Sequence, residues 1–335
     1  MAKILVTGAG GFIGSFIIEK ALSEGYETWA GVRASTNREY LQNKNIRFIE
    51  LDYFNQEKLI QQLKILKLTG EKWDYIIHNV GVTKSNDPKD FERFNYGILK
   101  NLVMSLIATQ MIPTCFVLMS SLSAWGAGDE KTFSPIKQTD EPHPETLYGK
   151  SKLKAEEYLQ TIPNFPYIIL RPTGVYGPRE KDYFLMMKSI KYGIDFVPGF
   201  KKQMLSFIYV KDLVNIIFAA IKKGNYRKTY FISDGKSYSS KDFRKYVANA
   251  LGKKYIIPIK MPLFMLKALS FLCGKIAGIT GKVSTLNPDK YHIMKQRNWL
   301  CDITPLQQDL HFIPEYDLEK GVNESIKWYK ENGWL

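Results

Sequence analysis

Residues 3–14, KILVTGAGGFIG, decide the fold. The first five are mostly apolar and predict a buried strand, and the glycine turn behind them opens directly into a helix expected over 12–24. The same alternation continues along the chain. We expect further strands at 27–32, 46–50, 74–79, 115–120, 167–171 and 229–233, and further helices at 55–67, 89–110 and 147–161. Short buried strands separated by helices predict an α/β fold with a doubly wound parallel sheet.

The turn between the first strand and its helix is suited to a dinucleotide. Gly8 permits the tight bend, Gly11 lets a pyrophosphate approach the backbone, and Gly14 lets the helix pack on the strand. The first helical residues, Phe12 and Ile13, offer amides at the positive end of the helix dipole. Because the motif lies between a strand and a helix in a βαβ pattern, it predicts a nucleotide site rather than a structural turn.

The end of the second strand bears on which nucleotide binds. Enzymes that prefer NAD usually place a carboxylate there for the ribose 2′-hydroxyl. This chain has Arg33 and Arg38 instead, with hydroxyl residues between them. A guanidinium suits a 2′-phosphate, so the sequence predicts NADP. NAD is the alternative, in which both arginines are ordinary solvated charges.

A tyrosine and a lysine four residues apart carry the predicted chemistry. Tyr148 and Lys152 fall on one face of the helix 147–161, one turn apart. A phenol titrates at about 10, and a nearby ammonium lowers that pKa, so the tyrosine can exchange a proton with a substrate oxygen. Ser121 follows the strand 115–120, where the crevice of a parallel sheet opens, and can bond the same oxygen. Taken alone, the pair also fits an exposed helix face.

Together these motifs resemble one known family. The chain is similar to extended short-chain dehydrogenases/reductases of the NAD-dependent epimerase/dehydratase superfamily, which implies a Rossmann-like sheet with a smaller, interleaved C-terminal substrate domain. The matching segments are Thr7 to Gly14, Asp52-Tyr53, Asn79-Val80-Gly81, Ser120-Ser121, Tyr148 with Lys152, and residues 171–179. The resemblance extends over essentially the whole chain.

The resemblance implies a role for each matching residue. Tyr148 is then the acid/base, Lys152 holds the nicotinamide ribose and tunes Tyr148, and Ser121 orients the substrate oxygen. Asp52 contacts the adenine amino group, and Asn95 is structural. The remaining cofactor residues are Tyr53, Asn79, Val80, Gly81 and the pair Pro172-Thr173, of which the last two lie beside the nicotinamide.

Missing residues narrow the reaction within the family. Ser121 is followed by Leu122-Ser123 and not by the acidic pair usual in dehydratases. Residues 204–206 lack the diphosphate-binding arginine usual in sugar-nucleotide enzymes, although Lys201 and Lys202 are near. The chain therefore looks most like the dihydroflavonol-reductase and 3β-hydroxysteroid-dehydrogenase branch, which implies reversible hydride transfer between NADP(H) and a ketone or alcohol on a steroid- or lipid-like substrate. The alternatives are a nucleotide-sugar epimerase with tightly bound NAD and a non-catalytic NAD(P)-sensing protein.

Proline and glycine become dense after Arg171 and suggest a change of architecture. We expect a nucleotide-binding domain over 1–172, to which 207–235 returns, and a substrate-binding region formed by 173–206 and 236–335. The resemblance also implies a homodimer, paired through a helix bundle that includes the Tyr148 helix.

The net charge of +14 is concentrated in the second half, since residues 1–180 carry +1 and residues 181–335 carry +13. No nucleic-acid module is recognisable, so a nucleic-acid partner is not expected. The segment 253–297 has nine basic residues and one acid, Asp289, and contains an apolar helix expected over 262–279. That helix either covers the substrate pocket, with its lysines in water, or lies on an anionic membrane.

Other features of the sequence bear on the protein's location in the cell, on membrane spans and on metal binding. Three cysteines, no CxxC pair and no signal peptide predict a cytoplasmic enzyme, peripheral at the inner membrane face if the basic helix binds lipid. No run of about 18 uncharged apolar residues occurs, so no spanning helix is expected. No His/Cys cluster has metal-ligand spacing, and no metal is expected.

Overall fold

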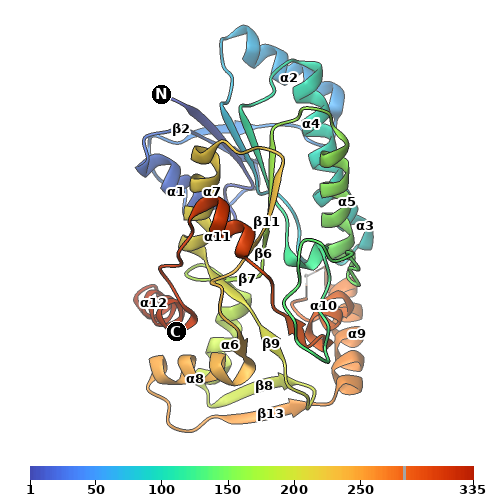
Figure 1. The fold of residues 1–335 in the computed structure, drawn as a ribbon, viewed down its shortest axis with the longest axis vertical. Helices are drawn as coiled ribbons and strands as arrows, with labels where there is room; N and C mark the ends of the chain where they lie inside the picture. The colour runs from blue at the N-terminus through green and yellow to red at the C-terminus, as the bar shows by residue number, and fades with distance from the viewer. Residues whose placement is uncertain (282–283) are drawn as a thin grey trace.

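The computed structural model describes residues 1–281 and 284–335. A seven-stranded sheet in the order β11-β6-β5-β4-β1-β2-β3 forms its upper half (Figure 1). All neighbouring strands in this sheet are parallel, which confirms the predicted α/β fold class. The strands are β1 (Lys3–Thr7), β2 (Glu27–Val32), β3 (Arg47–Glu50), β4 (Tyr75–His78), β5 (Cys115–Met119), β6 (Tyr167–Pro172) and β11 (Lys228–Ile232).

Helices cover both faces of this sheet because its strands are apolar on both sides. Ile4 and Val6 of β1 belong to the core on one face, and Leu5 between them belongs to the core on the other. The helices on the first face are α1 (Phe12–Ser23), α7 (Val210–Lys223) and α11 (Thr304–Leu310), and those on the second are α2 (Gln56–Leu68), α4 (Ile98–Ala108) and α5 (Leu147–Thr161). This is the doubly wound arrangement.

The single helix expected over 89–110 is divided. The structure has a short helix α3 (Pro88–Phe91), a π-helical turn over Glu92–Gly97, and then α4. A π turn inserts one residue into the helical repeat, which apolar spacing alone does not reveal. The turn contains Asn95, whose side chain is used near the cleft described below.

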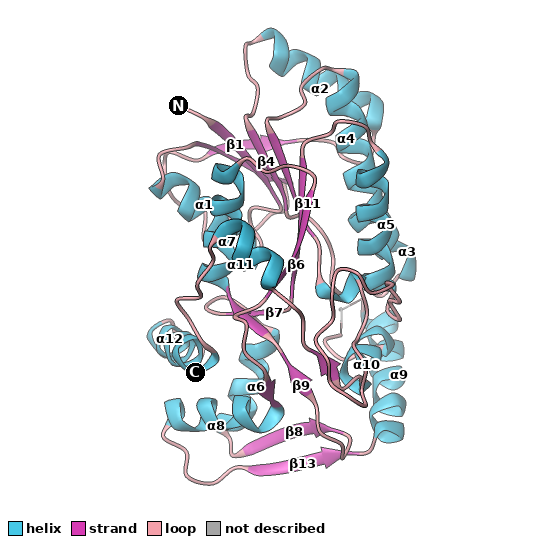
Figure 2. Cartoon of the chain, in the orientation of Figure 1, coloured by secondary structure: helices cyan, strands magenta, loops and turns pink. Residues whose placement is uncertain are grey.

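The lower half consists of short strands and helices (Figure 2). The strands form three small sheets, and most have only two or three residues. They are β7 (Gly174–Tyr176) with β10 (Phe207–Tyr209), β9 (Met204–Leu205) between β12 (Tyr238–Ser239) and β14 (Asn298–Trp299), and β8 (Ile194–Pro198) with β13 (Ile257–Met261). The helices are α6 (Asp182–Lys191), α8 (Ser240–Leu251), α9 (Leu263–Thr280), α10 (Pro288–Lys295) and α12 (Leu318–Glu331), and residues 122–124 form one 3₁₀ turn.

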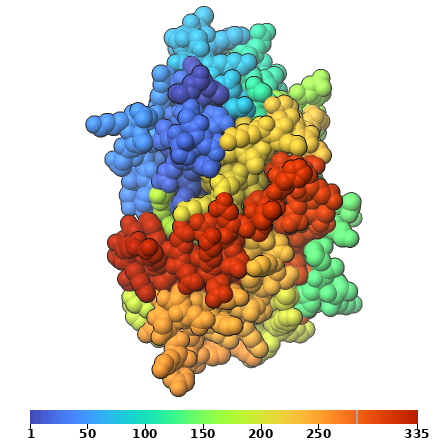
Figure 3. All heavy atoms as spheres, turned by 60° about the vertical axis from the view of Figure 1, so that its left-hand side comes forward, coloured from blue at the N-terminus to red at the C-terminus, as the bar shows by residue number. Residues whose placement is uncertain are grey.

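The two halves are interleaved in sequence. The chain leaves the sheet after β6, returns for α7 and β11, leaves again, and returns once more for α11. Figure 3 shows the C-terminal residues in red as a band between the N-terminal residues and the lower half. Asp212 at the start of α7 accepts the backbone N–H of Tyr316 at 3.0 Å and helps to hold this band.

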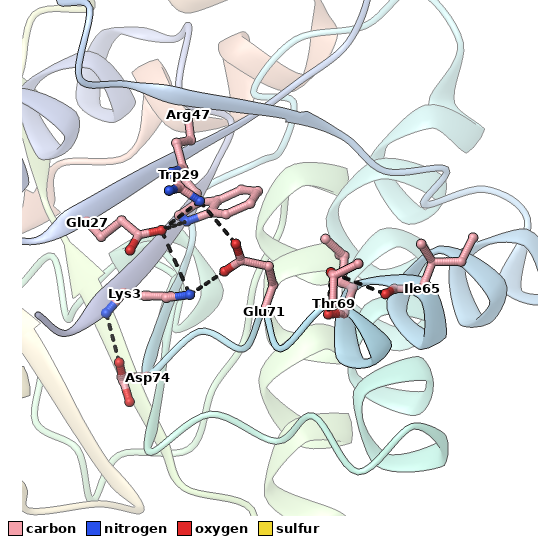
Figure 4. A network of polar contacts seen from close by, with 9 residues as sticks. Lys3, Glu27, Trp29, Arg47, Ile65, Thr69, Glu71 and Asp74 are labelled. Carbon is pink, nitrogen blue, oxygen red and sulfur yellow. Dashed lines mark hydrogen bonds and ion pairs between the residues drawn. The ribbon is translucent and has the colours of Figure 1, made fainter.

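Charged side chains join the amino ends of the central strands (Figure 4). Arg47 lies 3.1 Å from both Glu27 and Glu71, and Lys3 pairs with Glu71. The backbone N–H of Lys3 also donates to Asp74 at 2.8 Å. This network is at the end of the sheet opposite the cleft, so its role is in strand register rather than in chemistry.

Helix α9 matches the predicted segment but not the predicted packing. Seven large apolar residues of this segment are Leu263, Phe264, Leu266, Leu269, Phe271, Leu272 and Ile276, and only Leu266 among them is buried. The helix therefore does not cover the protein with an inward apolar face. By length and composition α9 is also apolar enough to cross a membrane. It does not contain an uncharged apolar run, because Lys267 and Lys275 interrupt the apolar residues. Length and composition alone are weak evidence for a span.

Candidate active site

A cleft of about 1210 Å³ opens along the carboxyl edge of the large sheet. Its lining comes from the segments directly after β1 to β6, because parallel strands all end at the same edge. It brings together most of the predicted site residues. These are Gly8, Gly11, Phe12, Ile13, Arg33, Asp52, Tyr53, Asn79, Val80, Gly81, Ser121, Tyr148, Lys152, Pro172 and Thr173.

Two predicted residues lie outside this lining. Gly14 is buried in α1, where an added Cβ would be 2.2 Å from the carbonyl oxygen of Gly8. Its role is thus the close packing of helix on strand. Arg38 has its guanidinium 4.4 Å from the centre of the Phe48 ring and 3.8 Å from Glu50. The structure therefore places Arg33, but not Arg38, at the cleft.

The glycine turn has the shape that a bound diphosphate requires. Gly8 has φ +68°, and a Cβ there would meet the backbone of Val80 at 2.9 Å. Gly11 is the N-cap of α1 and provides no side chain to bond the first helical amides, which remain available to an anion. The Oγ1 of Thr173 is buried without a partner among the described residues and can bond a ligand at the other end of the cleft. These observations fit a dinucleotide cofactor.

The Tyr148–Lys152 pair lies at the start of α5. Thr146 caps this helix by accepting the N–H of Gly149 at 2.9 Å. Lys152 is buried, its Nζ is 6.0 Å from the centre of the Tyr148 ring, and it donates to the carbonyl oxygen of Met119 at 2.8 Å. The pair thus spans the space between α5 and the end of β5, where Ser121 follows.

Burial controls the protonation of both groups. It raises the pKa of Tyr148 to about 12, and a hydrogen bond with Ser121 opposes this shift. It also lowers the pKa of Lys152 to about 8, against the field of Glu156, which raises it. The lowered tyrosine pKa expected from the sequence is not found, because the desolvation of the buried phenol outweighs its hydrogen bond with Ser121. At neutral pH both groups are protonated, so Tyr148 can donate a proton to a carbonyl oxygen.

A buried network behind Lys152 was missed at the level of sequence. Glu156 accepts hydrogen bonds from Nε and Nη2 of Arg171 at 2.9 and 2.7 Å and from the hydroxyl of Ser120. The Arg171 guanidinium also stacks 3.7 Å from the centre of the Trp125 ring. The spacing of four residues between Lys152 and Glu156 was the available signal, since it places both on one helix face.

Asn95 has the structural role that the resemblance implies. Its amide donates to the carbonyl of Val82 at 3.0 Å and to Ser151 at 2.9 Å, and its oxygen accepts the N–H of Val82 at 2.8 Å. These bonds tie the loop after β4 to α5. They keep Gly81 close to Lys152, since a Cβ on that glycine would lie 3.3 Å from Nζ.

The cleft beyond Tyr148 is charged. Its lining there includes two lysines and four carboxylates, namely Lys84, Lys290, Asp90, Glu180, Asp182 and Asp289. Lys84 and Lys290 both pair with Asp182, the latter at 3.5 Å. Asp289 of α10 accepts the backbone N–H of Leu147 at 2.7 Å and of Tyr148 at 3.3 Å. Among residues 1–281 and 284–335, no group of His, Cys, Asp or Glu is placed to hold a metal ion.

A glycine turn at the head of α1 and a Tyr–Lys–Ser constellation around the same cleft define an enzyme of the extended short-chain dehydrogenase/reductase type. Residues 4–233 match the model of the NAD dependent epimerase/dehydratase family, and the chain belongs to that family. Family membership makes the chain an enzyme, against the alternative of a non-catalytic sensor.

Its relatives differ in what they act on. One is the decarboxylating sterol-4-alpha-carboxylate 3-dehydrogenase of Dictyostelium discoideum, 24% identical over 87% of this chain and 94% of the relative. Another is the UDP-glucose 4-epimerase of Vibrio cholerae, 26% identical over 89% and 90%. The fold matches the UDP-glucose 4-epimerase of Thermotoga maritima, solved with UDP-glucose, at a TM-score of 0.77 and 21% identity over 98% and 99% of the two chains. The structure of the Bordetella bronchiseptica enzyme WbmH in complex with NAD⁺ gives a TM-score of 0.76 at 21% identity over 99% and 100%.

Proposed function

We propose that this enzyme transfers hydride reversibly between NADP(H) and a ketone or secondary alcohol on an uncharged, steroid- or lipid-like substrate. The observation that supports the reaction is the joint placement of Tyr148, Ser121 and Lys152 in the cleft that also holds the glycine turn. When bound, the nicotinamide supplies the hydride.

Tyr148 and Ser121 bind the substrate oxygen, and with Lys152 they control its protonation. The phenol of Tyr148, protonated at neutral pH, donates its proton to the oxygen of the substrate carbonyl as that oxygen becomes an alkoxide. Ser121 bonds the same oxygen and holds it in line with the phenol. The buried ammonium of Lys152 favours the phenolate that remains, and the reverse reaction returns the proton to it.

NADP is proposed because Arg33 is the cation at the end of β2 that lines the cleft. The loop behind it is closed by two short bonds, since the Thr36 hydroxyl accepts the N–H of Arg33 at 2.8 Å and the Thr36 N–H donates to the Arg33 carbonyl at 2.9 Å. A fixed loop with one guanidinium suits a ribose 2′-phosphate.

The charge of the substrate end supports an uncharged substrate. Four carboxylates face two lysines there, and both lysines already pair with Asp182. A nucleotide diphosphate placed in this part would meet a net negative lining. Lys201 and Lys202, which the sequence offered as diphosphate ligands, are absent from the described lining. The sterol dehydrogenase among the relatives is consistent with this proposal.

A nucleotide-sugar epimerase using NAD is the second candidate, favoured by the relatives and structures named as UDP-glucose epimerases. In that case Lys84 and Lys290 would have to leave Asp182 to reach a diphosphate.

The test is oxidation of NADPH, followed at 340 nm, with a panel of hydrophobic ketones in mixed micelles. We expect turnover, and a loss of kcat of about 100-fold or more in Tyr148→Phe with the Kd for NADPH unchanged. No turnover of any ketone, together with interconversion of a UDP-, GDP- or dTDP-sugar, would overturn the proposal in favour of the epimerase.

A further inference from the structure

Helix α9 turns mostly small residues toward the protein and most of its large apolar residues toward solvent. The residues it buries against the protein follow one stripe and are mostly small, namely Leu266, Ser270 and Ala277. Its large apolar residues point to solvent instead, with Phe264 at 74% and Ile279 at 86% of full exposure. A helix evolved only to close a protein core would bury these side chains. Its outward face is therefore built for an apolar surrounding.

The apolar surface continues beyond the helix. β13 pairs with β8 so that Ile259 lies beside Phe196, and Ile257 points to the same face two residues earlier. All three are exposed, while Asp195 on the opposite face is buried against Arg244. Figure 1 shows this ribbon at the lower tip of the molecule, leading into α9. The ribbon and the helix follow one another in the chain, and their exposed apolar residues are here called the basal face.

Lysines border the basal face without acidic partners. Residues 253–281 contain five lysines and no aspartate or glutamate. The lysines are Lys253, Lys254, Lys260, Lys267 and Lys275, all exposed, and none pairs with an acid within the described parts of the chain. Cations on flexible stems around an apolar surface complement the anionic headgroups and acyl chains of a bilayer. A protein partner would need an acidic and apolar surface to match this one. The same segment of a second copy could not supply it, because residues 253–281 contain no aspartate or glutamate.

We infer that the basal face docks on an anionic lipid bilayer, with α9 lying in the headgroup–acyl boundary rather than crossing the membrane. The helix packs on the protein at both ends of its buried stripe, from Leu266 to Ala277, and the Ala277 carbonyl accepts a hydrogen bond from Asn86 at 3.2 Å. β13 before it and α10 after it belong to the same half of the molecule. A spanning helix would have to detach from these contacts.

The docked position brings the cleft close to the lipid. α10 packs against α9 and contributes Asp289, Lys290 and Ile293 to the cleft lining. A substrate carried in the bilayer would therefore enter beside α10. This last step rests on the proposed function, whereas the docking itself does not.

The experiment is co-sedimentation of the full chain with phosphatidylcholine vesicles that contain from 0 to about 40% phosphatidylserine. Cofactor and substrate are left out. We expect binding that rises with the anionic fraction and falls with salt. Lys267→Gln with Lys275→Gln should weaken partitioning about thirty-fold, at about tenfold per 1.4 kcal/mol. Phe264→Glu with Ile279→Glu should abolish it.

The matched control is Ile65→Glu with Leu68→Glu on α2, which removes two equally exposed apolar residues at the far end of the molecule. It should bind vesicles like the unchanged protein, and thermal unfolding should be the same in both double glutamate variants. No sedimentation with 40% phosphatidylserine at low salt overturns the inference, as does equal loss in both variants. A dimer that dissociates in the α9 variant, without vesicle binding, would assign the face to a second copy. Failure of docking leaves ketone reduction untouched, and failure of ketone reduction leaves docking untouched.

Discussion

Glu156 is expected to support both the stability of the fold and the protonation of Lys152. Glu156 and Arg171 are each 1% exposed, and the only carboxylate that bonds the guanidinium among the described residues is Glu156, through Nε and Nη2. Replacing the carboxylate by an amide in Glu156→Gln keeps the shape but leaves the guanidinium buried without a counter-charge. Breaking such a pair costs about 3–5 kcal/mol, so we expect a loss of that size in the free energy of unfolding.

The same change should move the pH profile. Lys152 titrates at about 8, and the negative field of Glu156 is what raises that value against burial. Without the carboxylate the neutral amine is favoured, so the pKa falls further. If ketone reduction needs the ammonium, its rate is constant below about pH 8 and declines above it, and the decline starts at lower pH in Glu156→Gln.

Denaturant unfolding followed by fluorescence and the pH dependence of kcat/KM measure the two effects. Glu157→Gln is the matched control, since Glu157 is exposed on the same helix. The double change Glu156→Leu with Arg171→Met removes both charges and should recover most of the stability while keeping the lowered inflection. A variant Glu156→Gln within about 1 kcal/mol of the control, or an unmoved inflection, would refute the reasoning.

Two further predictions concern the cofactor. Arg33→Ala should raise the Kd for NADPH about 10- to 150-fold, the worth of a hydrogen bond to a charged group, and leave the Kd for NADH unchanged, whereas Arg38→Ala should change neither. Fluorescence titration measures both, and parallel weakening of the two nucleotides would contradict the assignment of Arg33. Gly14→Ala should cost about 1–3 kcal/mol and weaken nucleotide binding, because its Cβ would lie 2.2 Å from the Gly8 oxygen. Gly278→Ala, with open space around it, should not destabilise the protein, and equal effects at both glycines would contradict the packing argument.

Most strands of the large sheet could be predicted because they are buried on both faces, whereas β3 is largely exposed. Such strands read as short apolar runs, and all seven were placed from the sequence. The small sheets could not be placed, since strands such as β9 and β12 have two residues each and leave no periodic pattern. The π turn over Glu92–Gly97 was hidden for a different reason: the apolar residues on both sides of it still fit the pattern of one continuous helix.

The cofactor side of the cleft could be predicted because its residues come directly after strands. In a parallel sheet all strands end at the same edge, so these residues lie together. Other features depend on tertiary contacts between distant segments. Asp289 meets the Tyr148 amide across 141 residues of sequence, which no local spacing encodes. The outward orientation of α9 was equally hidden, because apolar residues lie around most of the helix and only Ser270 and Ala277 mark the buried side.

The position of α10 connects these observations. Its Asp289 holds the first turn of α5, on which Tyr148 lies, and its Lys290 pairs with Asp182 at the start of α6. On its other side α10 packs against α9. A displacement of α9 at a bilayer would therefore reach the amide of the proposed acid through one intervening helix. This predicts that anionic vesicles raise kcat/KM for a lipid ketone by a larger factor than the concentration of the ketone in the bilayer alone would explain. Asp289→Asn, which weakens the bond to Tyr148, should reduce this extra gain without reducing vesicle binding.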